Sequence, residues 1–184
     1  MHRFTSAILS AALGGALLAG AQAAPAQTAP PPTTAPKPAK NWPPPAYRIY
    51  AQALSDEIMA KHPELLSVTF HGVPPGLSGV YTMFAGSYPD RIGNPDDPDD
   101  IDVSVKGITI IDPRWRRTND TVKKFVVLEP LRDRSGEDVG LIVCAFRSDA
   151  GNSGERRFAK AAMDLRDELQ ARIPSYAALF EAAK

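Results

Sequence analysis

The sequence is poor in cysteine, and this limits the chemistry that the chain can carry. Its 184 residues include a single cysteine, Cys144. One cysteine excludes an internal disulfide framework, a Cys-x-x-Cys redox pair and a c-type haem attachment. Because Cys144 lies in the apolar run 139–146, we predict a small buried core residue, with a reactive thiol as the alternative. Stability must then come from packing.

An excess of positive charge is also missing. The chain has 21 Lys and Arg residues against 21 Asp and Glu residues. A domain that holds a polyanion normally shows a basic excess gathered on one face. We therefore expect no nucleic-acid partner.

The short motifs of common enzyme classes are absent as well. There is no Walker loop, no Gly-x-Gly-x-x-Gly and no paired zinc-ligand motif. The run 76–79, Gly-Leu-Ser-Gly, lacks the full Gly-x-Ser-x-Gly of a nucleophile elbow, and no strand-to-helix turn is expected around it. We predict no catalytic residues and favour a role other than enzyme. Catalytic groups can converge in space rather than in sequence, so an enzyme stays an alternative.

The amino terminus has the pattern of a secretory signal peptide. Arg3 precedes an apolar stretch from Ala7 to Leu18, and the small-residue triplet 21–23, Ala-Gln-Ala, follows. That order is typical of a signal that is cleaved after the triplet. The stretch is too short to span about 30 Å of hydrocarbon. We expect residues 1–23 to be removed, no membrane insertion after cleavage, and a periplasmic or secreted mature protein.

The remaining chain divides into a spacer and one domain. Residues 24–45 are rich in Pro, Ala and Thr, a composition that favours an extended, disordered linker. Residues 46–184 have the length of a single domain.

Hydrophobic periodicity predicts both helices and strands in this domain. Apolar residues at helical spacing, with Pro, Gly or Asp at the ends, predict helices at 47–61, 99–106 and 158–173. Apolar or alternating runs predict strands at 66–71, 80–85, 108–111, 122–131 and 139–147. Five strands in antiparallel neighbouring pairs, flanked by N-terminal and C-terminal helices, make an α+β domain. The loop between the second and third strands is the longest, and a pocket is expected there.

The last predicted hairpin carries a resemblance to a known family. Its residues are Glu129-Pro130-Leu131-Arg132-Asp133, followed by the run 135–143, Ser-Gly-Glu-Asp-Val-Gly-Leu-Ile-Val. This run resembles the Pro-Leu-x-Asp-x-x-Gly hairpin of Cache domains, the extracytoplasmic PAS-like sensors. The resemblance covers residues 46 to about 173 and implies a PAS-like five-stranded antiparallel sheet.

The same resemblance implies a function. It suggests a small-molecule ligand, such as an amino acid, organic acid, amine or purine, bound between the sheet and the segment after the second strand. Most members continue into a transmembrane helix and a signalling module. Nothing of that kind follows the last predicted helix here, so we expect a standalone domain without direct signalling across a membrane.

Two groups of residues are candidates for contacts with a polar ligand. Arg114 and Trp115 join a guanidinium, which grips carboxylates, to a flat aromatic wall. A surface connection with an anchoring Trp is the alternative. The residues on or just after the second predicted strand could line the pocket or belong to the core: they are Tyr81, Met83, Ser87, Tyr88 and Arg91.

An acidic run follows these residues, with five carboxylates inside seven positions. They belong to Asp96, Asp97, Asp99, Asp100 and Asp102. Ca²⁺ prefers such oxygen ligands, but the glycine and distal glutamate of an EF-hand loop are missing. We therefore predict a solvated loop that caps a helix and no cofactor, with Ca²⁺ binding as the alternative.

His71, at the end of the first predicted strand, has three interpretations. A lone histidine can act as a general base, ligate a metal or be a hydrogen-bonded structural residue, and we favour the last. For the whole protein, the leading hypothesis is a small-molecule binding domain. The alternative is an interaction domain that reaches an envelope protein partner through its spacer. A closed surface near Tyr81 and Trp115 would favour this alternative.

Overall fold

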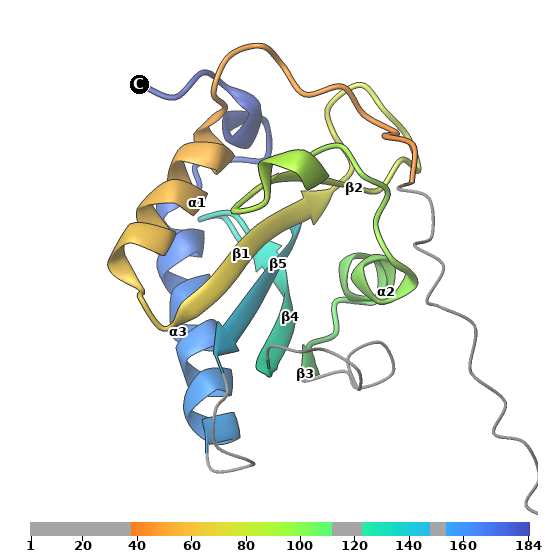
Figure 1. Ribbon diagram of the computed structural model, residues 1–184. Helices are drawn as coiled ribbons and strands as arrows, with labels where there is room; N and C mark the ends of the chain where they lie inside the picture. Colours follow the sequence, from red (N-terminus) through yellow and green to blue (C-terminus); the bar gives the residue numbers. More distant parts are fainter. Residues whose placement is uncertain (1–37, 112–122, 148–153) are drawn as a thin grey trace, which may run out of the picture. The chain divides into compact units, whose positions relative to one another are not determined.

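Figure 1 shows the computed structural model, in which residues 38–111, 123–147 and 154–184 are described. These residues belong to one compact unit, 37–184. Its α-helices are α1 (Tyr50–Lys61), α2 (Pro98–Lys106) and α3 (Glu155–Arg172), and short 3₁₀ turns lie at η1 (Pro89–Arg91) and η3 (Ala177–Phe180). Its strands are β1 (Leu65–Gly72), β2 (Thr82–Gly86), β3 (Ile110–Ile111), β4 (Lys124–Arg132) and β5 (Asp138–Arg147).

The five strands form one antiparallel sheet in the order β2-β1-β5-β4-β3. β1 and β5 lie at its centre although more than sixty positions of chain separate them. Along this pair, Leu65 lies opposite Phe146 and His71 lies opposite Leu141. The predicted fold class, an α+β domain with a PAS-like five-stranded antiparallel sheet, is confirmed.

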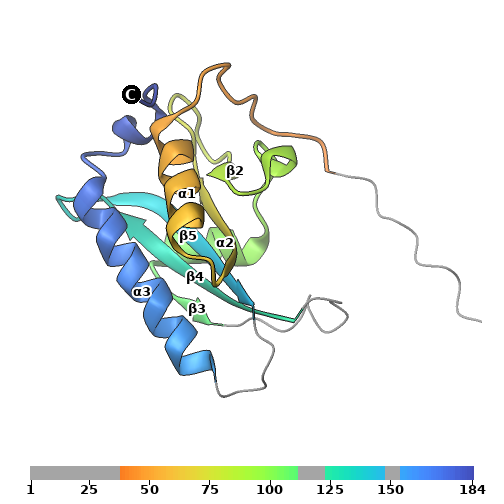
Figure 2. The same cartoon turned by 60° about the vertical axis from the view of Figure 1, so that its left-hand side comes forward.

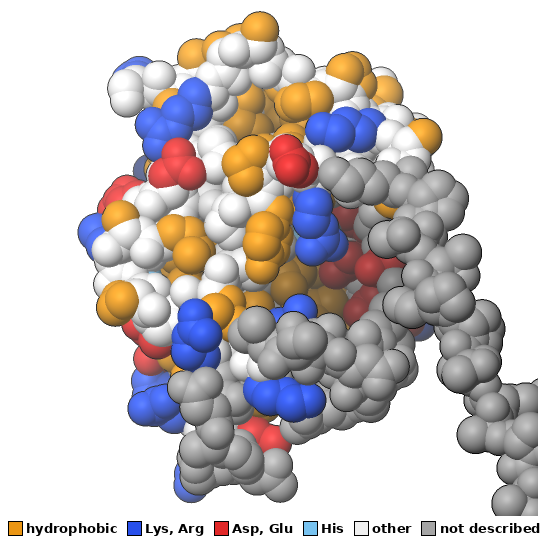
Figure 3. Space-filling view, in the orientation of Figure 1, with side chains coloured by type: hydrophobic (Ala, Val, Ile, Leu, Met, Phe, Trp, Pro, Cys, Tyr) orange, Lys and Arg blue, Asp and Glu red, His pale blue; other side chains and the backbone are white. Residues whose placement is uncertain are grey.

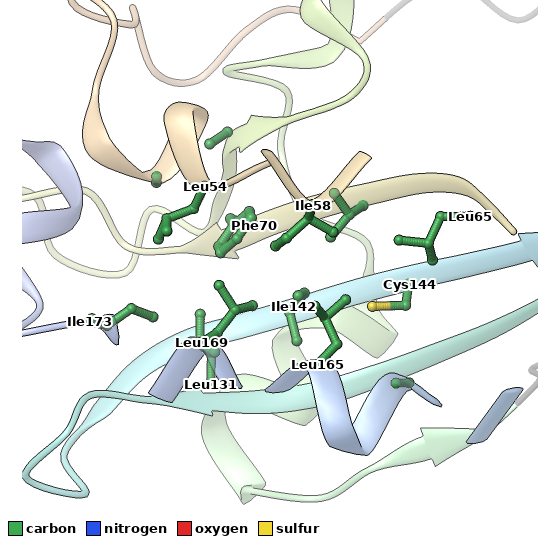
Figure 4. Close-up of a cluster of buried hydrophobic side chains, with 14 of the residues drawn as sticks. Leu54, Ile58, Leu65, Phe70, Leu131, Ile142, Cys144, Leu165, Leu169 and Ile173 are labelled. Carbon is green, nitrogen blue, oxygen red and sulfur yellow. The ribbon is translucent and has the colours of Figure 1, made fainter. Parts of the chain in front are cut away.

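The helices cover opposite faces of the sheet. α1 and α3 lie on one face and α2 lies on the other (Figures 1 and 2). Leu54 and Ile58 of α1, together with Leu165 and Leu169 of α3, point toward the sheet and belong to one cluster with Ile142 (Figure 4). All are almost completely buried. This larger core is the main source of stability, since each buried aliphatic side chain contributes about 1.5–3 kcal/mol.

A smaller core lies under α2. Val103 packs there with Val126, Leu128, Leu141 and Ala145 of β4 and β5. α2 begins at a capping box, in which Asp97 and Asp100 exchange backbone-to-carboxylate hydrogen bonds, and it ends at Gly107, whose φ is 63°. The predicted helix with an acidic first turn and a glycine stop is therefore confirmed, and this helix is fixed to the sheet.

The domain begins earlier than the predicted boundary at residue 46. The Asn41 N–H donates to the Gly93 carbonyl at 2.8 Å. The Trp42 ring packs edge-on against Phe180 with centroids 6.1 Å apart. The end of the predicted spacer thus contacts the domain. Among the described residues, no helix combines the length and the apolar character needed to span a membrane.

The structure shows the surroundings of Cys144 and of the predicted hairpin turn at Asp133. Cys144 is fully buried in the larger core, as predicted, and burial raises the pKa of its thiol. In the β4–β5 turn, one carboxylate oxygen of Asp133 accepts hydrogen bonds from the Ser135 N–H, the Ser135 hydroxyl and the Glu137 N–H. These bonds lower the pKa of Asp133 and show why an aspartate stands at this turn.

β1 and β5 approach closely at Gly140. Its φ is 113°, and a Cβ atom there would lie 2.1 Å from the His71 carbonyl oxygen. Gly136 in the β4–β5 turn also has a positive φ, 90°, but a Cβ atom there meets nothing within 4 Å. A side chain at either glycine would strain the backbone, but only a side chain at Gly140 would also clash with β1. Comparing the two positions therefore isolates the effect of the clash.

Gly140→Ala is expected to destabilise the domain more than Gly136→Ala. Both variants strain the backbone, and Gly140→Ala adds a clash with β1, which costs about 1–3 kcal/mol more. Urea unfolding of both variants measures the difference. Equal losses of stability would contradict the close approach of β1 and β5.

Candidate functional site

An open groove of about 360 Å³ lies where β1 ends and β5 begins. The β1–β2 loop forms one side, and the first residues of β5 lie at its base. Its described lining residues are Gly72, Val73, Pro74, Pro75, Gly76, Leu77, Tyr81, Ser104, Asp138, Val139, Gly140 and Tyr176. The close approach at Gly140 therefore also shapes the groove.

Two hydroxyl groups beside the groove are unused. The Ser104 Oγ and the Tyr176 hydroxyl are buried, and neither has a hydrogen-bond partner within the described part of the chain. Burial raises the pKa of Tyr176 to about 12, so this hydroxyl keeps its proton at neutral pH. Because a buried polar group without a partner costs free energy, a ligand group that reached either hydroxyl would gain a hydrogen bond.

A buried chain of polar side chains lies next to this groove. His71, the residue before Gly72 of the lining, is in contact with the acidic run through Asp96: its Nδ1 lies 2.7 Å from the Asp96 Oδ1. Its Nε2 lies 2.8 Å from the Thr69 Oγ1, and Thr69 and His71 share a face of β1. Asp100 adds a carboxylate oxygen 3.8 Å from Nδ1.

Burial and mutual charge shift the pKa values of this cluster. Burial raises the pKa of Asp100 to about 6 and also raises the pKa of Asp96, while His71 opposes both shifts. Burial by itself lowers the pKa of His71, but the hydrogen bond and charge of Asp96, with the charge of Asp100, outweigh it and raise the pKa. Keeping the side chains of this cluster charged inside the protein therefore costs free energy.

Several acidic side chains lie together near α2 (Figures 1 and 3). Figure 3 shows them in a hollow beside α2, with hydrophobic side chains on the floor of the hollow. Within the predicted metal candidates, Asp96 and Asp100 face His71, and Asp97, Asp99 and Asp100 form a second close group. Asp102 instead pairs with Lys106 at 2.8 Å.

The residues that the sequence predicts as ligand contacts lie in different parts of the structure. Tyr81 lines the groove, whereas Met83 is buried in β2. Ser87, Tyr88 and Arg91 follow the other end of β2, where the Ser87 hydroxyl bonds to the backbone of Val68. There the Arg91 guanidinium lies 5.5 Å from the centre of the Tyr88 ring. Arg114 and Trp115 lie outside the described residues.

Several residues of the site were not found from the sequence. Ser104 lies one helical turn after Asp100, a spacing that places both on the same side of α2. Thr69 belongs to an alternation of polar residues along β1, Ser67, Thr69 and His71, which is a detectable signal. Tyr176 lies after α3, and no pattern in the sequence associates it with the β1–β2 loop.

A second buried carboxyl group lies on the other face of the sheet. Glu129 is completely buried between β4 and α3, with both oxygens unpartnered by hydrogen bonds in the described residues. Burial raises its pKa to about 7, while Arg166, 3.8 Å away, opposes this shift. The charge of Asp167 on α3 also raises the pKa of Glu129. The charge of Glu129 in turn raises the pKa of the Cys144 thiol on β5.

Comparison with known proteins gives no family. No protein-family model matches the chain, and no curated protein matches it significantly. Among solved structures, a type II free methionine-R-sulfoxide reductase from Thermoplasma acidophilum aligns at 16% identity, with a TM-score of 0.46, over 65% of this chain and 86% of that one. The sensor domain of Escherichia coli DcuS aligns at 15% identity, with a TM-score of 0.37, over 61% and 71%. Neither likeness is strong enough to assign a function.

Glu129→Gln is expected to change how stability depends on pH. The pKa of Glu129 is about 7 in the folded protein and near 4.5 in the unfolded chain, so ionisation favours unfolding as pH rises between these values. In the parent protein, this group lowers the free energy of unfolding by at most about 3 kcal/mol across that range. Urea unfolding at several pH values should show the loss in the parent protein and a smaller loss in Glu129→Gln.

Glu137→Gln is the matched control for this prediction, because Glu137 is an exposed glutamate in the β4–β5 turn. It should keep the pH dependence of the parent protein. If Glu129→Gln had the same pH profile as the parent, Glu129 would not be the buried titrating group.

Proposed function

We propose that this chain is a small-molecule binding domain of the sensor type that acts outside the cytoplasm. Its ligand is a small polar compound, an organic acid or an amino acid, held in the groove at the end of β1. The observation that carries the proposal is the pair of unpartnered hydroxyls, of Ser104 and Tyr176, beside that groove.

The size and chemistry of the groove support binding of a small ligand. Its volume of about 360 Å³ lies within the range of ligand pockets, about 300–1,000 Å³. Tyr81, Leu77 and the prolines of the β1–β2 loop supply apolar surface, and the hydroxyls supply orientation. Polar and apolar surface contribute about equally to the lining, which suits a small polar ligand.

The charge near the groove gives the ligand a preferred polarity. Asp138 belongs to the lining, and none of the described lining residues is Lys or Arg. A ligand with an amino group or several hydroxyl donors suits this lining better than a simple carboxylate. Recognition of a carboxylate would fall to Arg114 and Trp115, a proposal that still rests on the sequence.

Export of the protein is supported by the predicted signal peptide at 1–23. The alternative, a domain that binds an envelope protein without a small ligand, predicted a closed surface near Tyr81. A groove lined by Tyr81 supports ligand binding instead.

A thermal-shift screen of the purified protein tests the proposal. The panel consists of amino acids, carboxylates, amines and purines, since a ligand at 100 times its Kd adds about 2.7 kcal/mol of stability. We expect stabilisation by one chemical class, with amino compounds favoured. No stabilisation by any class would contradict the proposal.

Ser104→Ala and Tyr176→Phe are expected to weaken binding of the hit compound by about two- to tenfold each, the effect of one hydrogen bond. Without ligand, neither variant should lose stability, because each removes a buried hydroxyl that has no partner among the described residues. Tyr88→Phe, at the far end of β2, is the control and should bind like the parent. Calorimetric titration measures all three, and equal affinities would place the ligand elsewhere.

A further inference from the structure

Three potential metal ligands converge on one point from three parts of the fold. His71 comes from β1, Asp96 from the segment between β2 and α2, and Asp100 from the first turn of α2. One ligand atom of each lies within 4.8 Å of the other two. Because the strand and the capped helix are both fixed by packing, this arrangement is held by the fold rather than by a loop alone.

The separations suit a single ion. Atoms bound to one tetrahedral ion at about 2.0–2.1 Å lie about 3.3 Å from each other. The His71 Nδ1 lies 2.7 Å from the Asp96 oxygen and 3.8 Å from the Asp100 oxygen. The two carboxylate oxygens lie within 4.8 Å of each other, so side-chain adjustments would bring the three ligand atoms to these separations.

One ligand atom of this group is buried and unused. The Asp96 side chain is 0% exposed, and its Oδ2 has no hydrogen-bond partner within the described chain. Among the described residues, Asp96 and Asp100 both form ion pairs with His71. Two buried carboxylates around one imidazole favour an added cation, although the positive charge of Arg91 also acts on His71.

The other ring nitrogen of His71 is already oriented. Its Nε2 lies 2.8 Å from the Thr69 Oγ1, so an Nε2–H can donate to that hydroxyl. Metal-bound histidines almost always donate their second ring N–H in this way, which fixes the tautomer and the direction of the free lone pair. With Nε2 protonated, Nδ1 becomes the ligand atom, and binding displaces the proton that it shares with Asp96.

We propose that His71, Asp96 and Asp100 form a binding site for a divalent transition-metal ion of the Zn²⁺ type. The imidazole nitrogen favours such an ion over Ca²⁺, which prefers oxygen ligands alone. Solvent or ligand atoms complete the coordination. The site lies next to the groove but does not depend on the proposed small-molecule function, because the ion is held by protein side chains alone.

Calorimetric titration of the chelator-treated protein with ZnCl₂ tests the proposal. We expect one ion per chain, and Co²⁺ in its place should give the visible absorption of a site with nitrogen and oxygen ligands. Asp96→Asn and His71→Gln should each weaken Zn²⁺ binding at least about tenfold, and Thr69→Val should weaken it by about tenfold through the lost support of His71.

Asp102→Asn is the matched control. Asp102 belongs to the same acidic run, but it pairs with Lys106 and is not part of the group around His71. It should bind Zn²⁺ like the parent protein. Thermal melting of each variant without metal confirms folding, and Thr69→Val, which removes no ligand, keeps the test valid if Asp96→Asn or His71→Gln unfolds.

Three results would overturn the proposal. The folded parent protein could fail to bind Zn²⁺ at a defined stoichiometry. Asp102→Asn could weaken binding as much as Asp96→Asn, which would show diffuse attraction to an acidic surface. Ca²⁺ could compete with Zn²⁺ at equal concentration, which would show a site made of oxygen ligands without His71. A failure of the ligand screen with intact Zn²⁺ binding would count against the proposed function alone.

Discussion

The antiparallel pairing of β1 with β5 determines where every other part of the domain lies. It joins two strands that are far apart in the sequence and places them at the centre of the sheet. With β1 fixed against β5, β2 and β4 can add only on the outer sides. The pairing also brings the His71 backbone against Gly140, so the end of β1 and the beginning of β5 form the base of the groove.

This pairing also divides the domain into two chemically different faces. Alternate residues of β1 and β5 contribute Phe70, Ile142 and Cys144 to the large core under α1 and α3. The residues between them include Thr69 and His71, which face the α2 side, where the core is small and a polar cluster is buried. The first face holds most of the apolar contacts, with Glu129 as a buried exception, and the second carries a buried polar cluster that costs stability. Polar groups retained at such a cost point to function.

The sequence predicts the helices and strands of this fold better than it predicts which strands pair with each other. The period of apolar residues gives the three helices and five strands to within a few residues, because each pattern depends on local backbone geometry. The Asp133 turn, which carries the resemblance to Cache domains, is likewise a local structure. Pairing of β1 with β5 depends on contacts between distant segments, for which a single sequence holds no local signal.

The same limit explains the outcome for the site. Tyr81 lines the groove, but this groove lies at the β1–β2 loop, whereas a pocket was expected at the loop between the second and third strands. The acidic run was recognised as a potential ligand set. The contact of His71 with Asp96 spans 25 positions and was not foreseen. Ser104 and Tyr176 come from elements on opposite sides of the sheet. Their shared position beside the groove depends on how α2 and η3 pack, which periodicity does not specify.

The most direct test of this account is to map the ligand position by NMR. Amide chemical shifts of the ¹⁵N-labelled protein would be followed while the stabilising compound is added. The account predicts that the largest changes fall on 72, 73, 76, 77, 81, 104, 138–140 and 176, the described lining residues that carry an amide N–H. Changes confined to 87–91, at the other end of β2, would contradict it and place the binding site beside Tyr88 and Arg91.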